Sequence, residues 1–126
     1  MSMQQAAATY GDRFEQVPRA AYSRHGDYLG VILQRGNYTL DRVDEVLTLH
    51  RSAENREVIG FTLKGMRLIA EQILSDEDLS TVDDIEISLV VLAAQKTSPK
   101  FSGWYACLLK FPIRIPRGTL ELASSH

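Results

Sequence analysis

The sequence is poor in cysteine and has no long apolar run. Its single cysteine, Cys107, cannot form a disulfide within the chain, so the fold must be stable without a covalent cross-link. The longest apolar stretch, residues 89–94, is far shorter than the roughly 20 residues that cross a bilayer. Residues 1–8 lack the basic start and the apolar run of a signal peptide. From these absences we expect a cytoplasmic protein.

The motifs of common catalytic and cofactor sites are also absent. The chain has no Walker-type glycine loop, no G-x-G-x-x-G and no G-x-S-x-G. His25 and His50 lack the close spacing of zinc ligands. Cys107 has no basic residue beside it that would activate a thiolate, which favours an inert core cysteine. We therefore expect no catalytic residue, no bound metal and no cofactor.

One acidic segment could be compared with a calcium-binding loop. Residues 71–86 contain seven carboxylates and no basic residue. A loop that begins at Asp76 would place Thr81 where the sharp turn needs glycine, and Ile87 where a bidentate glutamate is needed. The segment is therefore interpreted as a solvated loop.

Composition favours one ordinary globular domain over residues 1–126. Hydrophobic residues make up 44% and charged residues 24% of the chain, values that do not fit a disordered or coiled-coil protein. The net charge of -2 provides no general attraction to nucleic acid or to an anionic membrane. This small total nevertheless conceals a division, because residues 96–117 contain five basic residues and no acid.

Alternating apolar residues predict two strands in the first half. Within residues 22–34, Leu29, Val31 and Leu33 would share one face, and Gly36 with Asn37 signals a turn after them. Within residues 57–64, Ile59, Phe61 and Leu63 would do the same. Residues 41–50 fit a helix with Thr39 as its N-cap as well as a strand, and periodicity does not decide between them.

A helix and further strands are predicted after residue 65. Met66, Ile69, Ala70 and Ile73 have the i, i+3, i+4, i+7 spacing of a buried helical face. The pattern then predicts a polar loop over 75–84, a buried strand over 85–94, a loop over 96–103, a strand over 104–111 and an edge strand over 113–120, where prolines interrupt pairing. Residues 1–20 and 123–126 are expected to be flexible or frayed.

Three segments of the first half have a recurring pattern of apolar and acidic residues. They read Asp-Tyr-Leu-Gly-Val-Ile-Leu at 27–33, Val-Asp-Glu-Val-Leu at 43–47 and Glu-Val-Ile-Gly-Phe-Thr-Leu at 57–63. In the order and spacing of these segments, the first half resembles a family of small bacterial domains of unknown function. The resemblance covers residues 22–74 and implies a three-stranded meander followed by a helix, which favours a strand over 46–51. It implies no activity. The chain departs from the family by lacking a glycine within residues 50–56 and an acid within 61–63.

The expected fold is therefore a single α+β domain. It comprises an antiparallel sheet of about five or six strands with one main helix packed on one face, in which residues 22–74 form the meander plus helix and residues 85–120 add strands. The sequence does not decide whether these last strands join the same sheet.

The polarised second half is the expected interaction surface. Its candidate residues are Lys96, Lys100, Trp104, Tyr105, Lys110 and Arg114. We expect a non-enzymatic homodimer or protein-binding domain, in which segments 71–86 and 96–117 complement each other across a dimer axis, a second copy covers 89–94, and sheet edges at Tyr22 and Ile113 invite pairing. The alternatives are a small-ligand barrel or enzyme with a pocket lined by Trp104 and Tyr105, and a single-stranded nucleic-acid binder that uses 96–117.

Overall fold

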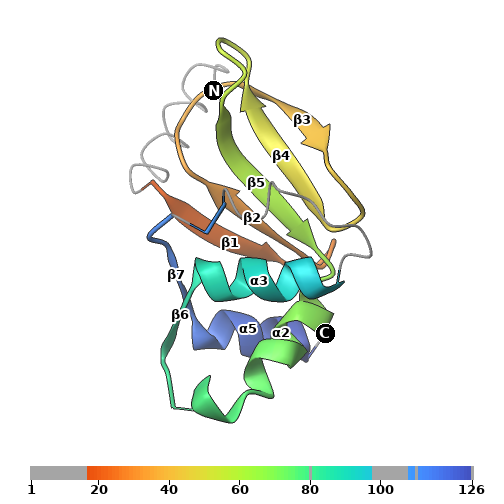
Figure 1. Ribbon diagram of the computed structural model, residues 1–126, viewed down its shortest axis with the longest axis vertical. Coiled ribbons are helices and arrows are strands. Elements are labelled where there is room, and N and C mark those ends of the chain that lie inside the picture. Colours follow the sequence, from red (N-terminus) through yellow and green to blue (C-terminus); the bar gives the residue numbers. More distant parts are fainter. Residues whose placement is uncertain (1–16, 80, 98–107, 110, 126) are drawn as a thin grey trace, which may run out of the picture.

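A computed structural model describes residues 17–79, 81–97, 108, 109 and 111–125 of the chain (Figure 1). These residues form a five-stranded antiparallel sheet, a separate two-stranded sheet and three α-helices, which confirms the α+β class. The strands of the main sheet lie in the order β1-β2-β5-β4-β3. They are β1 (Arg19–Ser23), β2 (Tyr28–Ile32), β3 (Tyr38–Arg42), β4 (Leu47–Ser52) and β5 (Val58–Lys64).

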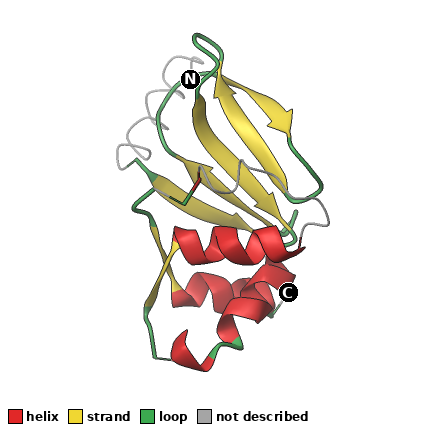
Figure 2. Cartoon of the chain, in the orientation of Figure 1, coloured by secondary structure: helices red, strands yellow, loops and turns green. Residues whose placement is uncertain are grey.

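The helices lie together at one end of the main sheet, as Figure 2 shows with helices in red and strands in yellow. They are α2 (Met66–Leu74), α3 (Ile87–Thr97) and α5 (Arg117–Ser124), with a short 3₁₀ helix η1 (Glu77–Leu79) after α2. The small sheet pairs β6 (Asp84–Glu86) with β7 (Arg114–Pro116). Strand β3 lies along the edge of the main sheet that is farthest from the helices (Figure 1). One helix was expected, whereas the described residues contain three.

One face of the main sheet supplies part of the core. Alternate residues of β2, β4 and β5 point to this face and pack into one cluster with the helices. The fully buried members from the strands are Leu29, Val31, Leu47, Leu49, Phe61 and Leu63. The two predicted apolar faces and the strand over 46–51 are thus confirmed. The expected meander is wrong, because β2 pairs with β5, and β4 lies on the other side of β5.

The predicted strand over 22–34 is instead two strands, β1 and β2, joined by a tight turn. Asp27 in this turn has a positive φ of 50°, a conformation that aspartate tolerates better than most residues. Strand β3 was not anticipated, although Tyr38 and Leu40 alternate with the polar residues Thr39 and Asp41. The sequence analysis predicted a turn at Gly36 and Asn37 and considered Thr39 only as the N-cap of a possible helix over 41–50.

Asp27 also caps the N-terminus of helix α2, although it lies 40 residues earlier in the sequence. Gly65, the N-cap of α2, has no side chain to offer. The backbone N–H of Arg67 donates instead to both carboxylate oxygens of Asp27, at 3.1 and 3.3 Å, which is the role of an N-cap side chain. Tyr22 Oη donates to Asp27 Oδ1 at 2.8 Å. Burial, reinforced by this bond to a carboxylate, raises the pKa of Tyr22 to about 12.

The predicted strand over 85–94 is wrong, because only β6 is extended and α3 begins at Ile87. The buried residues Ile87, Val90, Val91 and Ala94 have helical spacing, so the signal was present. Leu89 and Leu92 lie on the other side of the same helix and made the stretch look uniformly apolar. A short apolar run fits both a buried strand and a buried helix.

The edge strand predicted over 113–120 is also wrong. Only β7 is extended, and α5 follows with Pro116 as its N-cap. Ala123 is fully buried, so the chain is not frayed there, and Ile113 is buried rather than at an open sheet edge. Strands β6 and β7 form their own sheet. The strand predicted over 104–111, the loop beyond Thr97 and residues 1–16 lie outside the described residues, apart from Leu108, Leu109 and Phe111.

Candidate functional site on the uncovered face of the sheet

The residues predicted to form an interaction surface are not brought together where the structure describes them. Lys100, Trp104, Tyr105 and Lys110 lie outside the described residues. Arg114 pairs with Glu86, which directly precedes α3, whereas Lys96 lies in the last turn of α3. The helical rise between these positions is roughly 14 Å. Lys96 and Arg114 therefore do not form one patch by themselves.

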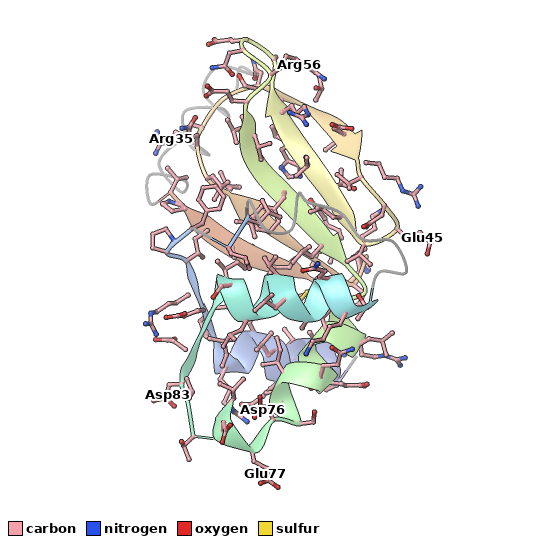
Figure 3. The ribbon with its side chains drawn as sticks, in the orientation of Figure 1. Arg35, Glu45, Arg56, Asp76, Glu77 and Asp83 are labelled. Carbon is pink, nitrogen blue, oxygen red and sulfur yellow. The ribbon has the colours of Figure 1, made fainter. Side chains whose placement is uncertain are left out.

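The acidic and basic segments meet within a single chain. Strands β6 and β7 pair in antiparallel register, and Arg114 Nη2 lies 3.3 Å from Glu86 Oε1. Arg117 donates its backbone N–H to the Asp83 carbonyl at 2.7 Å. The complementarity expected across a dimer axis is thus partly satisfied inside the protein. Figure 3 shows Asp76, Glu77 and Asp83 at the helical end, far from Arg35 and Arg56 at the opposite end of the sheet.

The second face of the main sheet carries exposed apolar side chains. We call it the uncovered face because the helices among the described residues pack with the opposite face. Tyr28 is 38% exposed, Tyr38 52% and Leu40 68%. The strand register places these three side chains on the side opposite the core. Tyr28 is next to the core residue Leu29, and Tyr38 and Leu40 pair with residues of β4 that alternate with its core residues. The other large exposed apolar side chains, Leu68, Leu92 and Leu122, lie on three different helices.

A hollow of about 480 Å³ lies on this face. Its lining comes from all five strands and includes three tyrosines, an isoleucine, a leucine and a few polar groups. Those that bear on its chemistry are Tyr28, Ile32, Tyr38, Leu40, His50, Thr62 and Lys64. Volumes of this size fall in the range of ligand and peptide sites. The predominance of tyrosine and aliphatic groups suits contact with another molecule.

His50 is the central polar group of the uncovered face. Its Nε2 lies 2.8 Å from Thr62 Oγ1, and its ring stacks on that of Tyr38 with centroids 4.6 Å apart and planes inclined by 10°. The residue is only 9% exposed. Because burial disfavours the charged imidazolium, it lowers the pKa of His50 from its ordinary 6.5. The stack is therefore neutral at physiological pH.

Gly60 provides the space for the His50 ring. The two residues are directly opposite in the β4–β5 register. A Cβ at position 60 would lie 2.9 Å from His50 Nδ1 and 2.6 Å from the Val31 carbonyl oxygen. The lack of a side chain at Gly60 thus leaves room for the His50 ring, and the hydrogen bond with Thr62 fixes the orientation of that ring.

The described residues hold no group of three or more histidine, cysteine, aspartate or glutamate side chains that could bind a metal ion. None of the described helices combines the length and apolar composition needed to cross a bilayer. Half of the uncovered face was visible in the sequence, where Tyr28, Gly30 and Ile32 alternate with the core residues of the same strand. Its other half, Tyr38 and Leu40, belongs to β3 and was missed.

No family model, no curated protein and no solved structure matches the chain. The resemblance of residues 22–74 to a family of small bacterial domains therefore stays a prediction. Function has to be argued from the uncovered face and from the strand edges beside it.

Proposed function

We propose that the chain is a non-enzymatic, self-associating domain of the bacterial cytoplasm. The observation that supports this best is the grouping of Tyr28, Tyr38 and Leu40 on one face of the sheet. Exposed apolar side chains that gather on one surface mark a site of contact with another molecule. Tyrosine is also enriched at protein interfaces, because it combines apolar area with a polar tip.

A second copy of the chain is the occupant that the uncovered face and its border favour. The face ends at β3, which in the described part of the chain is hydrogen-bonded to β4 alone. Natural edge strands are usually short, charged or covered, because an open edge pairs readily with another strand. Here the edge is five residues long. Its charged residues, Asp41 and Arg42, stand at one end, and Leu40, the most exposed large apolar side chain described, lies at its centre.

Light scattering coupled to gel filtration tests the proposal. At micromolar concentration we expect the wild-type chain to have twice its mass of 14.1 kDa. Leu40→Lys should shift the mass towards that of one chain, because a lysine at an edge strand opposes pairing. Leu68→Lys, which alters a leucine on α2 that is 52% exposed, is the matched control and should leave the dimer intact. A wild-type mass of one chain would contradict the proposal.

A further inference from the structure

On the outer edge of β3, the backbone groups of three residues pair with no other strand of the described part of the chain. Asn37 O accepts from Ala53 N at 2.9 Å, and Val43 N donates to Leu47 O at 3.0 Å, so residues 37 and 43 direct their backbone groups towards β4. Backbone groups of successive residues point to alternate sides of a strand. Residues 39 and 41 therefore also face β4. The N–H and C=O groups of Tyr38, Leu40 and Arg42 face outwards.

We infer that two copies of the chain join through antiparallel pairing of β3 with β3, about a two-fold axis centred on Leu40. The inference rests on the proposed self-association and names its surface and register. In this register Tyr38 lies opposite the partner's Arg42, Thr39 opposite the partner's Asp41, and Leu40 opposite the partner's Leu40. The outward backbone groups at 38, 40 and 42 then form the hydrogen-bonded pairs of an antiparallel ladder.

Other registers with the correct hydrogen-bonding parity are less favourable. A shift of two positions in one direction would place Asp41 opposite the partner's Asp41, and like charges directly opposite are destabilising. The same shift in the other direction would place Arg42 opposite Gly36, which lies outside the strand with a φ of 144°. The register centred on Leu40 is the one that pairs all five residues of β3.

The side chains complement one another in the same register. On the uncovered face, Leu40 is 68% exposed and would be covered by the partner's Leu40. Beside it, the Tyr38 ring would lie next to the partner's Arg42 guanidinium, a pair that gains from cation–π attraction. Because the contact is isologous, the Tyr38–Arg42 pair occurs twice, once at each end of the paired β3 strands.

The opposite face of the strand adds a polar pair. Thr39 Oγ1 accepts a hydrogen bond from Arg56 Nη1 at 2.8 Å, which leaves the hydroxyl hydrogen free to donate outwards. Asp41 lies directly beyond it in the partner strand. Its Oδ2 accepts from Arg51 Nε at 2.7 Å, so the carboxylate is held in place with acceptor capacity to spare.

The arrangement of the elements leaves room for this contact. The helices lie at the far end of the sheet from β3 (Figure 1). A two-fold axis normal to the sheet would therefore join the two sheets into one of ten strands, without a helix between them. The two uncovered faces, each with its hollow of about 480 Å³, would lie on the same side of the joined sheet.

Cysteine cross-linking tests the register. In a Cys107→Ala background, Leu40→Cys should form a covalent dimer on mild oxidation, because a hydrogen-bonded antiparallel pair holds Cα atoms about 5.5 Å apart, within disulfide range. We expect cross-linking about tenfold or more faster than for Leu122→Cys, since strand pairing holds the thiols at a high effective concentration. Leu122 is a matched control because it is 45% exposed on α5.

A second pair of variants fixes the register itself. Tyr38→Cys alone should not cross-link, because the two copies of residue 38 would lie roughly 14 Å apart along the ladder. A mixture of Tyr38→Cys and Arg42→Cys chains should cross-link. If the chain has the mass of a dimer but Leu40→Cys reacts no faster than Leu122→Cys, the inference fails and self-association stands. A mass of one chain overturns both.

Discussion

Gly60 is the single residue on which the geometry of the uncovered face depends most. It lies opposite His50 in the sheet, and a Cβ there would lie 2.6 Å from the Val31 carbonyl oxygen. Gly30 lies on the same face but faces open space, since a Cβ there would meet only the Ala21 carbonyl oxygen at 3.9 Å. Substitutions at the two glycines can therefore be compared. Only at Gly60 would an added Cβ clash with its neighbours, so only there do we expect glycine to be required.

We predict that Gly60→Ala lowers the free energy of unfolding by about 1–3 kcal/mol, the usual cost of forcing an extra group into a filled space. Gly30→Ala should change it by less than about 0.5 kcal/mol, as expected for a substitution without a steric clash. Urea titrations of both variants check this. Equal losses at the two positions would show that the clash with the Val31 carbonyl and His50 is not what requires glycine.

His50 makes stability depend on pH. Its pKa is below 6.5 in the folded protein because burial disfavours the imidazolium, whereas the unfolded chain binds a proton near 6.5. The unfolded state therefore binds more protons as the pH falls. The stability that neutral His50 provides is complete above about pH 6.5 and is lost below it.

Urea titrations at pH values of about 7.5 and 5.5 should give a lower free energy of unfolding at the lower pH. In His50→Asn the difference should be smaller, because the titrating group has been removed. An unchanged difference in the variant would assign the pH dependence to other groups.

At the scale of elements, the sequence was informative where one face of an element is buried and the other is polar. The strand around Phe61 and helix α2 have such a pattern and were predicted from it. The strand over 46–51 was favoured only by the family resemblance, because its periodicity fits a helix as well. Helix α3 was not, because apolar residues on its less buried side hid the helical period. The cap of α2 was also beyond local reasoning, since Asp27 lies 40 residues before the N–H that it accepts from.

Helix α5 was missed for a different reason. Its short segment follows Pro116 and contains Gly118, both of which argue locally against a helix. Leu120 and Ala123 are nevertheless fully buried against the rest of the core, and α5 packs mainly on α2. Tertiary packing therefore stabilises this helix more than its own sequence does.

The contribution of α5 can be measured with two neighbouring leucines. Leu120→Ala should lower the free energy of unfolding by about 2–5 kcal/mol, as for other fully buried leucines. Leu122→Ala, which removes the same atoms from a side chain that is 45% exposed, should cost less than about 1 kcal/mol. Similar losses for both variants would mean that α5 is not docked as described.

At the scale of the whole molecule, the charge division seen in the sequence has a structural outcome. The acidic segment and part of the basic segment lie side by side in β6 and β7, where Arg114 pairs with Glu86. Among the described residues, Tyr28, Tyr38 and Leu40 group on the uncovered face and its β3 border, whereas the exposed leucines of the helices lie singly on three different elements. The sequence could not indicate this, because the position of an edge strand is a property of the sheet order.

The proposed assembly predicts which backbone amides of β3 are protected from hydrogen exchange. In an isolated chain, the amide hydrogens of Tyr38, Leu40 and Arg42 face solvent and should exchange rapidly, while those of Thr39 and Asp41 are bonded to β4. Pairing through β3 would protect the first three as well. This pattern distinguishes a paired edge from a contact made through the helices.

Residue-resolved hydrogen exchange of β3 at increasing protein concentration therefore tests the central claim most directly. We predict slow exchange of the Tyr38, Leu40 and Arg42 amides in the wild-type chain, increasing to the rate of exposed amides on dilution or in Leu40→Lys. Rapid exchange of these three amides in a sample that has twice the mass of 14.1 kDa would contradict the account.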